Sequence, residues 1–463
     1  MASAPRKTGI LDSAALFLFA VAVHVPYLLG RPFFFADDFG LLADADNLTS
    51  GATRFLDVPA WGVWRLGQRA LWWAGYRVFG LDPLPYAWLS VLLHGACVVA
   101  LAALLRRLGW QRGAVIAGAA VFATLSVPAL AVRYMVQDAV LVAAVLVIFA
   151  AIAHDAGRVR AATLLFLAGA LFYEQALCAP LVFAAVNVWR RRRPFAGLAA
   201  PVGAAAAFVA VNLWTLRHAT KIFAYNTAGF GADALRQIVF APWLAAGVPP
   251  GFSMRAFGAA LLLAATAAIL IAAFLWLPAR GVLLGIALAW IAALPYAGRN
   301  VGWWPPYYFY LPGAGLAAAV AAPRIRLWPL ACVPLVLWNV RGDLAGGKAT
   351  LAEMRRYEQV TRETPPQSGV PFAVFVNVNS GLAWAGWQFG GSLRAFELWD
   401  APAGPARCYT GNDLDEVRAR MRRDFPAASR RGRWPEDRPP ALRGARPPAR
   451  RRLFPWPPRI ASY

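Results

Sequence analysis

Long blocks of apolar residues constrain this chain more than any other feature. Several blocks run for about 17–21 residues, the length that a helix needs to cross about 30 Å of hydrocarbon. Hydrocarbon offers no partner to a free backbone N–H or C=O group, so we expect helices, which satisfy these groups internally. The sequence therefore predicts an α-helical polytopic membrane protein.

Composition supports this class and argues against a nucleic-acid-binding protein. Of the 463 residues, 59% are hydrophobic and 15% are charged, whereas an ordinary soluble domain carries about 25% charged residues. The net charge is +23, but 14 of the 46 basic residues follow position 417, in a tail rich in Arg and Pro. Many others lie in short connections between apolar blocks, as is typical of cytoplasmic loops. We expect no nucleic-acid partner.

The apolar blocks predict about eleven transmembrane helices. The first block follows Arg6 and Lys7 and continues to Gly30 without a small-residue cleavage pattern, which favours an uncleaved helix over a signal peptide. The predicted spans are residues 10–29, 86–104, 114–131, 138–153, 160–174, 176–189, 196–214, 257–277, 281–297, 308–322 and 327–341.

Basic residues predict the orientation of these helices. They fall on alternate connections, which the positive-inside rule assigns to the cytoplasm. An odd number of spans then places the C-terminus on the other side of the membrane. The basic residues are Arg6, Lys7, Arg106, Arg107, Arg112, Arg158, Arg160, the four arginines at 190–193, Arg280, Arg324 and Arg326.

The polar segments predict how the rest of the chain is organised. In the first outer loop, at about 30–85, Trp and Leu residues alternate with Arg and Gln between Trp61 and Phe79, which indicates interfacial helices. Residues 343–363 predict a charged helix and 372–378 a strand. We expect a transmembrane domain that carries the chemistry (1–341), a small non-cytoplasmic α/β appendage (342–418) and a disordered tail (419–463).

The pair Asp37-Asp38 is the strongest candidate for a functional site. It lies in an aromatic run at 33–39, at the edge of the membrane. Desolvation and like-charge repulsion both oppose ionisation of the two carboxyls together, so we expect the chain to use them. The structural alternative is helix capping or a salt bridge with Arg31 or Arg54. Adjacent side chains point in different directions, so only one is expected to reach a reacting atom.

Glu174, Asp138 and His94 are further candidates. Glu174 is the only glutamate in the first 352 residues, and its structural alternative is an ion pair, for example with Arg133. For Asp138 the favoured alternative is capping of the fourth span. His94 lies in mid-span, where an interhelical hydrogen bond is the commoner role.

Cations suited to a phosphate group lie on the same predicted side. Arg217, His218 and Lys221 begin the second long outer loop, and Arg299 follows a later span. Anchoring to lipid headgroups is an equally weighted alternative for them. The sequence contains no zinc-type spacing, Walker loop, dinucleotide fingerprint or nucleophile elbow, so nucleotide hydrolysis and serine-type catalysis have no support.

Four short stretches of the sequence carry a resemblance to a known family. They are Asp37-Asp38, residues 78–86 (VFGLDPLPY) running into Leu92-Leu93-His94, residues 173–180 (YEQALCAP) and residues 308–312 (YFYLP). Their order and spacing, over about residues 10–340, resemble the GT-C superfamily of membrane glycosyltransferases. The most similar branch contains protein O-mannosyltransferases and the aminoarabinose transferase of lipid A.

The chain also departs from this pattern. Tyr173 stands where the family commonly has lysine, and Tyr307 stands where a charged residue is usual. Arg299 is a candidate to replace that charge. The match ends before the C-terminal appendage, so the resemblance leaves the acceptor open among a lipid, a glycan and a protein.

The resemblance implies an inverting glycosyltransferase that moves a sugar from a polyprenyl-phosphate donor to a hydroxyl acceptor. The reaction would take place on the non-cytoplasmic face of a membrane, expected to be the bacterial inner membrane. Asp37, supported by Asp38, is the expected general base. No cofactor is firmly implied, and a divalent metal stays open. The residues expected to bind the donor phosphate or substrate are Arg217, Lys221, Arg299, Glu174, Asp138, His94, Tyr308 and Tyr310.

Two other functions stay open at the level of sequence. One is a transporter or flippase of lipid-linked saccharides, which an inverted repeat and charges at the membrane midplane would favour; neither is evident in the sequence. The other is a membrane scaffold without catalysis, which would leave the carboxylate pair unexplained.

Overall fold

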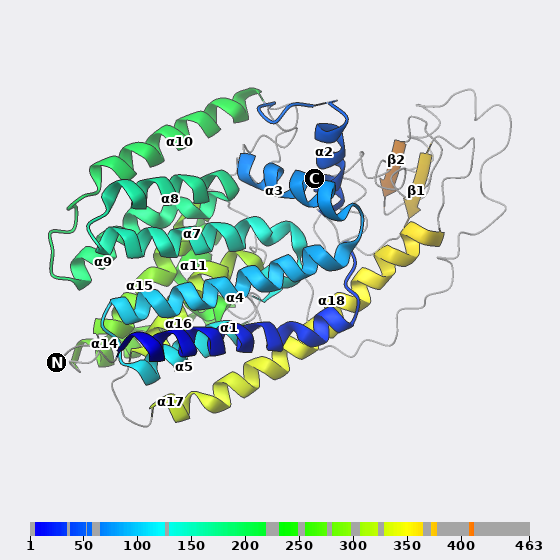
Figure 1. Cartoon of the computed structure of the whole chain (residues 1–463). Helices are drawn as coiled ribbons and strands as arrows, with labels where there is room; N and C mark the ends of the chain where they lie inside the picture. Colours follow the sequence, from blue (N-terminus) through cyan, green and yellow to red (C-terminus); the bar gives the residue numbers. More distant parts are fainter. Residues whose placement is uncertain are drawn as a thin grey trace, which may run out of the picture. The chain divides into compact units, whose positions relative to one another are not determined.

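The computed structural model is almost entirely helical in the part of the chain that it describes (Figure 1). The chain forms two compact units, Met1–Tyr357 and Glu358–Tyr463. Helix α18 (Val333–Glu363) runs through the domain boundary that the sequence placed at 341/342. The described residues are 5–34, 38–51, 53–57, 65–125, 129–218, 231–248, 255–275, 280–297, 306–322, 328–363, 372–376 and 407–411.

The first half of the first unit is built on long helices that pack side by side. Helix α4 packs against α1, α5 and α7, and α7 packs against α8 (Figure 1). The shorter helices α2 and α3 pack against each other in the first predicted outer loop. The elements are α1 (Pro5–Leu29), α2 (Asp38–Thr49), α3 (Leu66–Phe79), α4 (Pro83–Arg107), α5 (Arg112–Thr124), α6 (Leu130–Arg133), η1 (Met135–Gln137), α7 (Asp138–Asp155) and α8 (Val159–Phe172).

The second half of the first unit continues the helical pattern. Every one of the eleven predicted spans overlaps a helix, although this overlap does not establish that each one crosses a membrane. The elements are η2 (Glu174–Cys178), α9 (Ala179–Trp189), α10 (Ala199–His218), α11 (Ala232–Val239), α12 (Ala241–Ala245), α14 (Ala256–Leu275), α15 (Arg280–Ala293), η5 (Leu294–Tyr296), η6 (Pro306–Phe309), α16 (Tyr310–Ala321), α17 (Trp328–Ala331) and α18.

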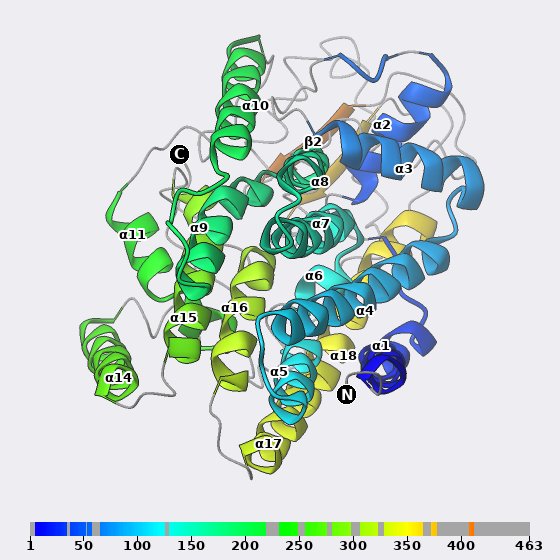
Figure 2. The ribbon, with the colours of Figure 1, turned by 60° about the vertical axis from the view of Figure 1, so that its left-hand side comes forward.

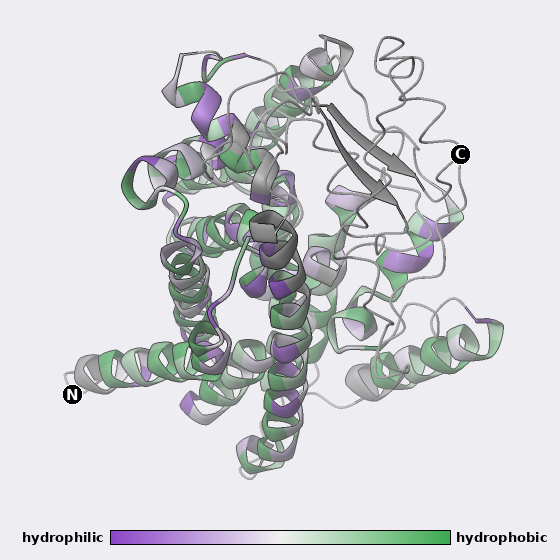
Figure 3. Ribbon diagram, turned by 90° about the vertical axis from the view of Figure 1, so that its right-hand side faces the viewer, coloured by the Kyte–Doolittle hydropathy of each residue, from purple (hydrophilic) through white to green (hydrophobic). Residues whose placement is uncertain are grey.

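Three described helices are long and apolar enough to cross a membrane, namely Gly9–Leu29, Pro83–Arg107 and Met135–Asp155. Hydrophobic residues cover most of the helices, and hydrophilic residues fall in short stretches (Figure 3). Large apolar side chains such as Leu18, Leu164 and Val188 are exposed on the outside, as expected where lipid is the solvent. The chain is therefore an integral membrane protein, and the number of eleven spans stays a prediction.

Small residues let α15 and α16 pack closely, and the two helices lie side by side in Figure 2. A Cβ atom on Gly285 would lie 2.2 Å from the backbone nitrogen of Ala319, and one on Gly315 would lie 2.4 Å from that of Ala289. Both positions therefore require glycine, as in other close helix contacts of membrane proteins.

The ends of two helices follow directly from their local sequence. The Asp82 carboxylate accepts a hydrogen bond from the Leu84 N–H at 3.1 Å, and Pro83 occupies the first helical position of α4. At the C-terminal end of α8, Tyr173 has an extended backbone, with φ −154° and ψ 135°, and ends the helix. Glu174 therefore lies at a helix junction, as the sequence predicted.

The second unit contains a small parallel sheet. Strands β1 (Phe372–Val376) and β2 (Arg407–Gly411) pair from Phe372 opposite Arg407 to Val376 opposite Gly411. Strand β1 lies inside the strand predicted at 372–378, and the charged helix predicted at 343–363 forms the C-terminal part of α18. Of the predicted appendage at 342–418, the structure describes only 342–363, 372–376 and 407–411, so the α/β appendage as a whole stays a prediction. The predicted tail at 419–463 lies outside the described residues.

Candidate functional site

Asp38 begins α2 and is fully buried. Its Oδ1 atom accepts a hydrogen bond from the backbone N–H of Val136 at 2.6 Å. A hydrogen bond from a backbone N–H stabilises the charged form of a carboxylate. Asp38 therefore ties the first predicted outer loop to the short helix η1. Asp37 lies outside the described residues.

Aromatic packing holds the chain just before this carboxylate. Phe34 is fully buried, and its ring lies 5.4 Å from that of Tyr86 on α4 and 6.5 Å from that of Trp72 on α3. Trp72 and Tyr86 also stack on each other at 5.2 Å. Phe34 thus packs the start of the first predicted outer loop against α3 and α4, and Asp38 comes shortly after Phe34 in the chain.

A further anchor in the same loop is Arg69. Its side chain is 3% exposed and pairs with Asp44 of α2 at 2.8 Å. Its Nη1 atom also donates to the carbonyl oxygens of Phe55 at 2.6 Å and Asp57 at 3.0 Å. Arg69 therefore joins α2, α3 and the turn between them into one support for Asp38.

Gln68 connects the Asp38 contact to a second acid. Its Nε2 atom donates to the Val136 carbonyl at 3.0 Å, so the backbone of Val136 is bonded to Asp38 through its N–H and to Gln68 through its C=O. The Gln68 Oε1 atom accepts from Arg65 Nη1 at 3.4 Å. Arg65 in turn binds both oxygens of Glu174, at 2.8 and 2.7 Å.

The Arg65–Glu174 pair is a planar, bidentate ion pair at the junction of α8 and η2. Both side chains are 18% exposed, and the Arg65 guanidinium lies 4.1 Å from the centre of the Tyr173 ring. Burial acts to lower the pKa of Arg65, but the Glu174 carboxylate and Tyr173 outweigh it and raise that pKa above its usual value. Arg65 therefore remains charged.

Tyrosines continue the site beyond Glu174. Tyr308 is buried, and its ring stacks on that of Tyr296 at 3.9 Å. Gln175 donates to the backbone carbonyl of Tyr308 at 3.1 Å and to that of Ala292, also at 3.1 Å. The Glu174 junction is thus bonded to the ends of α15 and η6, which places Tyr308 beside it.

Asp138 and His94 have other partners. The buried Asp138 carboxylate lies in the first turn of α7 and accepts a hydrogen bond from the Ser90 hydroxyl of α4. His94 Nε2 lies 3.2 Å from the Ala123 carbonyl, which makes it the donor, so Nδ1 accepts from the Tyr310 hydroxyl at 2.7 Å. These residues join helices in the core.

A second buried cluster was not predicted from the sequence. Arg133 Nη1 lies 2.8 Å from the backbone oxygen of Asp343 and 3.3 Å from its Oδ1 atom. His24 Nδ1 lies 3.4 Å from Asp343 Oδ2, and Tyr27 donates to the Arg133 carbonyl at 2.9 Å. Glu174 does form an ion pair, the structural alternative for this residue, but its partner is Arg65 and not Arg133, which pairs with Asp343 on α18.

The structure thus brings some predicted site residues together and separates others. Asp38, Glu174 and Tyr308 belong to one connected network, to which Arg65 and Gln68 are additions that the sequence did not single out. The sequence signal around Arg65 was the alternation of aromatic and cationic residues, which indicated an interfacial helix and not a site residue. Lys221 and Arg299 lie outside the described residues, and the side chain of Arg217 is likewise not described. Within the described residues, no group of three His, Cys, Asp or Glu side chains could hold a metal ion.

Comparison with known proteins gives a distant structural likeness. No protein-family model matches the chain, and no curated protein matches its sequence. A crystal structure of ArnT from Cupriavidus metallidurans bound to undecaprenyl phosphate is similar over 89% of this chain and 88% of that one, with 14% identity and a TM-score of 0.43. A TM-score below 0.5 does not establish a shared fold, so the description of this chain rests on its own helices and contacts.

Proposed function

We propose that this protein is an inverting glycosyltransferase that moves a sugar from a polyprenyl-phosphate donor to a hydroxyl acceptor at the non-cytoplasmic face of the membrane. The observation that supports this most is the network from Asp38 through Val136 and Gln68 to the Arg65–Glu174 pair. It gathers scarce carboxylates and a permanent cation where several apolar helices end. Carboxylates and a cation at such a place suit acid–base chemistry on an anionic, lipid-linked substrate.

The position of the arginines supports the proposed face. The network lies where α8 ends and α7 and η2 begin, while Asp155, at the other end of α7, binds Arg107, Arg190 and Arg192. Arginine-rich connections are typical of the cytoplasmic side. The end that carries Asp38 and Glu174 is then the non-cytoplasmic one, where a lipid-linked sugar donor would be used.

The proposed chemistry assigns different roles to the two adjacent acids. The acceptor hydroxyl is a weak nucleophile, and Asp37 would take its proton as it attacks the anomeric carbon. The bond from that carbon to the phosphate oxygen breaks, and polyprenyl phosphate leaves with the electron pair. Asp38, held by Val136, would keep the segment in place, and Arg65 is a described cation that could offset charge on the leaving phosphate.

The proposal is tested by reconstituting the full chain in vesicles and supplying a panel of polyprenyl-phosphate sugars with lipid, glycan and peptide acceptors. The expected result is a glycosylated acceptor together with an equal amount of free polyprenyl phosphate. Movement of an intact lipid-linked sugar across the bilayer, with no cleavage for any donor, would instead favour a flippase and contradict the proposal.

A further inference from the structure

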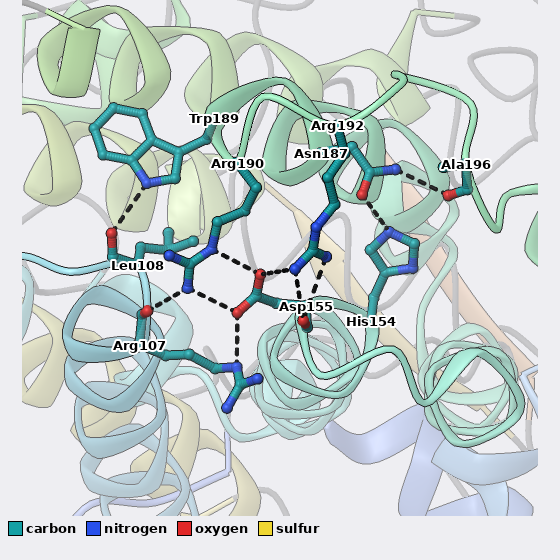
Figure 4. Close-up of polar contacts among 9 residues, drawn as sticks. All are labelled: Arg107, Leu108, His154, Asp155, Asn187, Trp189, Arg190, Arg192 and Ala196. Atoms are coloured by element: carbon teal, nitrogen blue, oxygen red, sulfur yellow. Dashed lines mark hydrogen bonds and ion pairs between the residues drawn. The ribbon is translucent and has the colours of Figure 1, made fainter.

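Three helix connections meet at the C-terminal end of α7, the end opposite the Asp38 network. Helix α7 separates the two places, since it begins at Asp138, two residues after Val136, and ends at Asp155. Its 18 residues span about 26 Å at 1.5 Å per residue. The connections are those between α4 and α5, α7 and α8, and α9 and α10 (Figure 4).

Asp155 organises these connections with one buried carboxylate. Arg107 Nε lies 2.8 Å from Oδ2, while Arg190 binds Oδ1 at 2.8 Å and Oδ2 at 2.9 Å (Figure 4). Arg192 donates to the Asp155 backbone oxygen at 3.3 Å and lies 3.6 Å from Oδ1. One negative charge is thus shared by three arginines, which leaves an excess of positive charge.

The same arginines are open to solvent while their anchor is not. The Asp155 side chain is 2% exposed, whereas those of Arg107, Arg190 and Arg192 are 40%, 30% and 44% exposed. Each guanidinium has five N–H donors and Asp155 uses only some of them. Arg190 Nη2 also donates to the Arg107 backbone oxygen, and the partial exposure of the three side chains leaves other donors accessible at the surface around the buried carboxylate.

The turn after α9 is shaped by its own contacts. Asn187 donates to the backbone oxygens of Pro194 at 3.1 Å and Ala196 at 2.9 Å, and its Oδ1 atom lies 3.1 Å from His154 Nε2 (Figure 4). Trp189 Nε1 donates to the Leu108 carbonyl at 3.0 Å. The arginine-rich turn is thus bonded to both neighbouring connections.

Further exposed arginines surround this centre. Arg158 and Arg160 belong to the connection and first turn after Asp155, and Arg191 and Arg193 belong to the turn after α9. Among the described residues, no ion pair neutralises any of these four. Arg191 also has φ 57°, a backbone conformation that costs a non-glycine residue free energy. The surface therefore carries a fixed, uncompensated positive charge.

We infer that this surface binds the headgroup of an acidic phospholipid of the surrounding membrane. It lies at the ends of apolar helices, including two that are long enough to cross a membrane, Pro83–Arg107 and Met135–Asp155. A helix that crosses the hydrocarbon ends at the level of the lipid phosphates, and guanidinium groups bind phosphate oxygens in pairs. This binding site is separate from the proposed catalytic network and does not depend on the reaction.

The test removes two exposed arginines that do not touch Asp155. The full chain, purified in a neutral detergent, is titrated with short-chain phosphatidylglycerol, with phosphatidylcholine of equal chain length and with inorganic phosphate. Each arginine near an anionic surface contributes about fivefold in affinity. The Arg191→Gln/Arg193→Gln variant should therefore bind phosphatidylglycerol about 30-fold more weakly than the unchanged protein.

A matched control removes the same charge elsewhere. Arg54, between α2 and α3, and Arg77, on α3, are exposed and precede the N-terminus of α4 in the chain. Arg54→Gln/Arg77→Gln should leave the affinity for phosphatidylglycerol unchanged. An equal loss in both double variants would contradict a specific site. Binding of phosphatidylcholine as tight as that of phosphatidylglycerol, or of inorganic phosphate as tight as that of the lipid, would overturn the assignment of an acidic phospholipid.

Discussion

The Arg65–Glu174 ion pair joins the first predicted outer loop to the junction between α8 and α9. Its two hydrogen bonds, at 2.8 and 2.7 Å, have the forked geometry in which an arginine binds a carboxylate most strongly. Both side chains are largely shielded from water, at 18% exposure, so the pair is less screened than a surface pair. Arg65 also donates to Gln68, which binds the Val136 backbone that in turn donates to Asp38. The ion pair is therefore connected to the hydrogen bond of Asp38.

A double-mutant cycle with Arg65→Gln, Glu174→Gln and the double variant measures this coupling. We expect an interaction of about 1–2 kcal/mol in the free energy of unfolding, because each single change leaves its partner without a counter-charge. The readout is unfolding by denaturant in mixed micelles. The exposed pair Arg236 and Asp233 on α11, whose charged atoms are 3.6 Å apart, should couple by less than about 0.5 kcal/mol. Equal coupling in the two pairs would contradict the account.

Single residues show what local sequence can and cannot predict. Asp38 and Glu174 were predicted as site residues because a carboxylate beside apolar helices is costly and rare. Their partners could not be predicted, because Arg65 lies 109 residues from Glu174 and Arg133 lies 210 from Asp343. Hydrophobic pattern and charge spacing act over a few turns of helix, whereas these pairs depend on how helices meet.

At the scale of elements, helix α18 is tied to the bundle by buried charge. Asp343 and Arg133 are each 4% exposed, and His24 of α1 lies on the other side of the Asp343 carboxylate. A Cβ atom on Gly346 would lie 2.6 Å from Arg133 Nη1. One turn of α18 is thus shaped to receive the Arg133 guanidinium.

Removal of the Asp343 carboxylate should weaken this attachment strongly. We expect Asp343→Asn to lower the free energy of unfolding by about 3 kcal/mol, because it leaves a buried guanidinium with less compensation. Lys348→Gln, on an exposed position of the same helix, should change it by less than about 0.5 kcal/mol. If the two variants unfolded at the same denaturant concentration, the buried cluster would have no structural role.

The contact between α15 and α16 makes a second prediction at this scale. Gly315→Ala would force a methyl group against the backbone of Ala289 and should cost about 1–3 kcal/mol. Gly203→Ala on α10, where a Cβ atom would meet nothing within 4 Å, should be neutral or stabilising by up to about 1 kcal/mol. Thermal unfolding of the two variants separates them, and a loss from Gly203→Ala as large as that from Gly315→Ala would contradict the close contact.

Helix locations were the most predictable part of the fold. Each apolar block forms a helix because a helix satisfies its own backbone and needs no partner from elsewhere in the chain. The extent of α18 was less predictable, since its polar residues after 341 resemble those of a soluble segment. The contacts of Asp343 and Gly346 with Arg133 explain why the helix continues there.

At the scale of the whole molecule, the first unit has two chemically different ends. One end carries Asp38, Glu174 and Arg65, and the other carries Asp155 with its arginines. Our account assigns the arginine end to the cytoplasm and the acidic end to the other side of the membrane.

Cysteine labelling tests this orientation. In a Cys408→Ala background, Ser50→Cys and Arg193→Cys place single thiols at exposed positions of the two ends, and the remaining described cysteines are buried. A membrane-impermeant maleimide added to intact cells should label Ser50→Cys and leave Arg193→Cys unlabelled until the cells are lysed. The reverse pattern would invert the topology.

The central claim is that the adjacent acids after α1 perform the transfer reaction. The most direct measurement is the rate of sugar transfer by purified Asp37→Asn and Asp38→Asn, compared with Asp233→Asn as an exposed control at a helix start. Loss of a general base typically costs about 10²–10⁴-fold in rate. Asp37→Asn should therefore fold normally and transfer sugar at least about 10²-fold more slowly than the unchanged protein. Asp233→Asn should retain full activity. Full activity of both Asp37→Asn and Asp38→Asn would contradict the account.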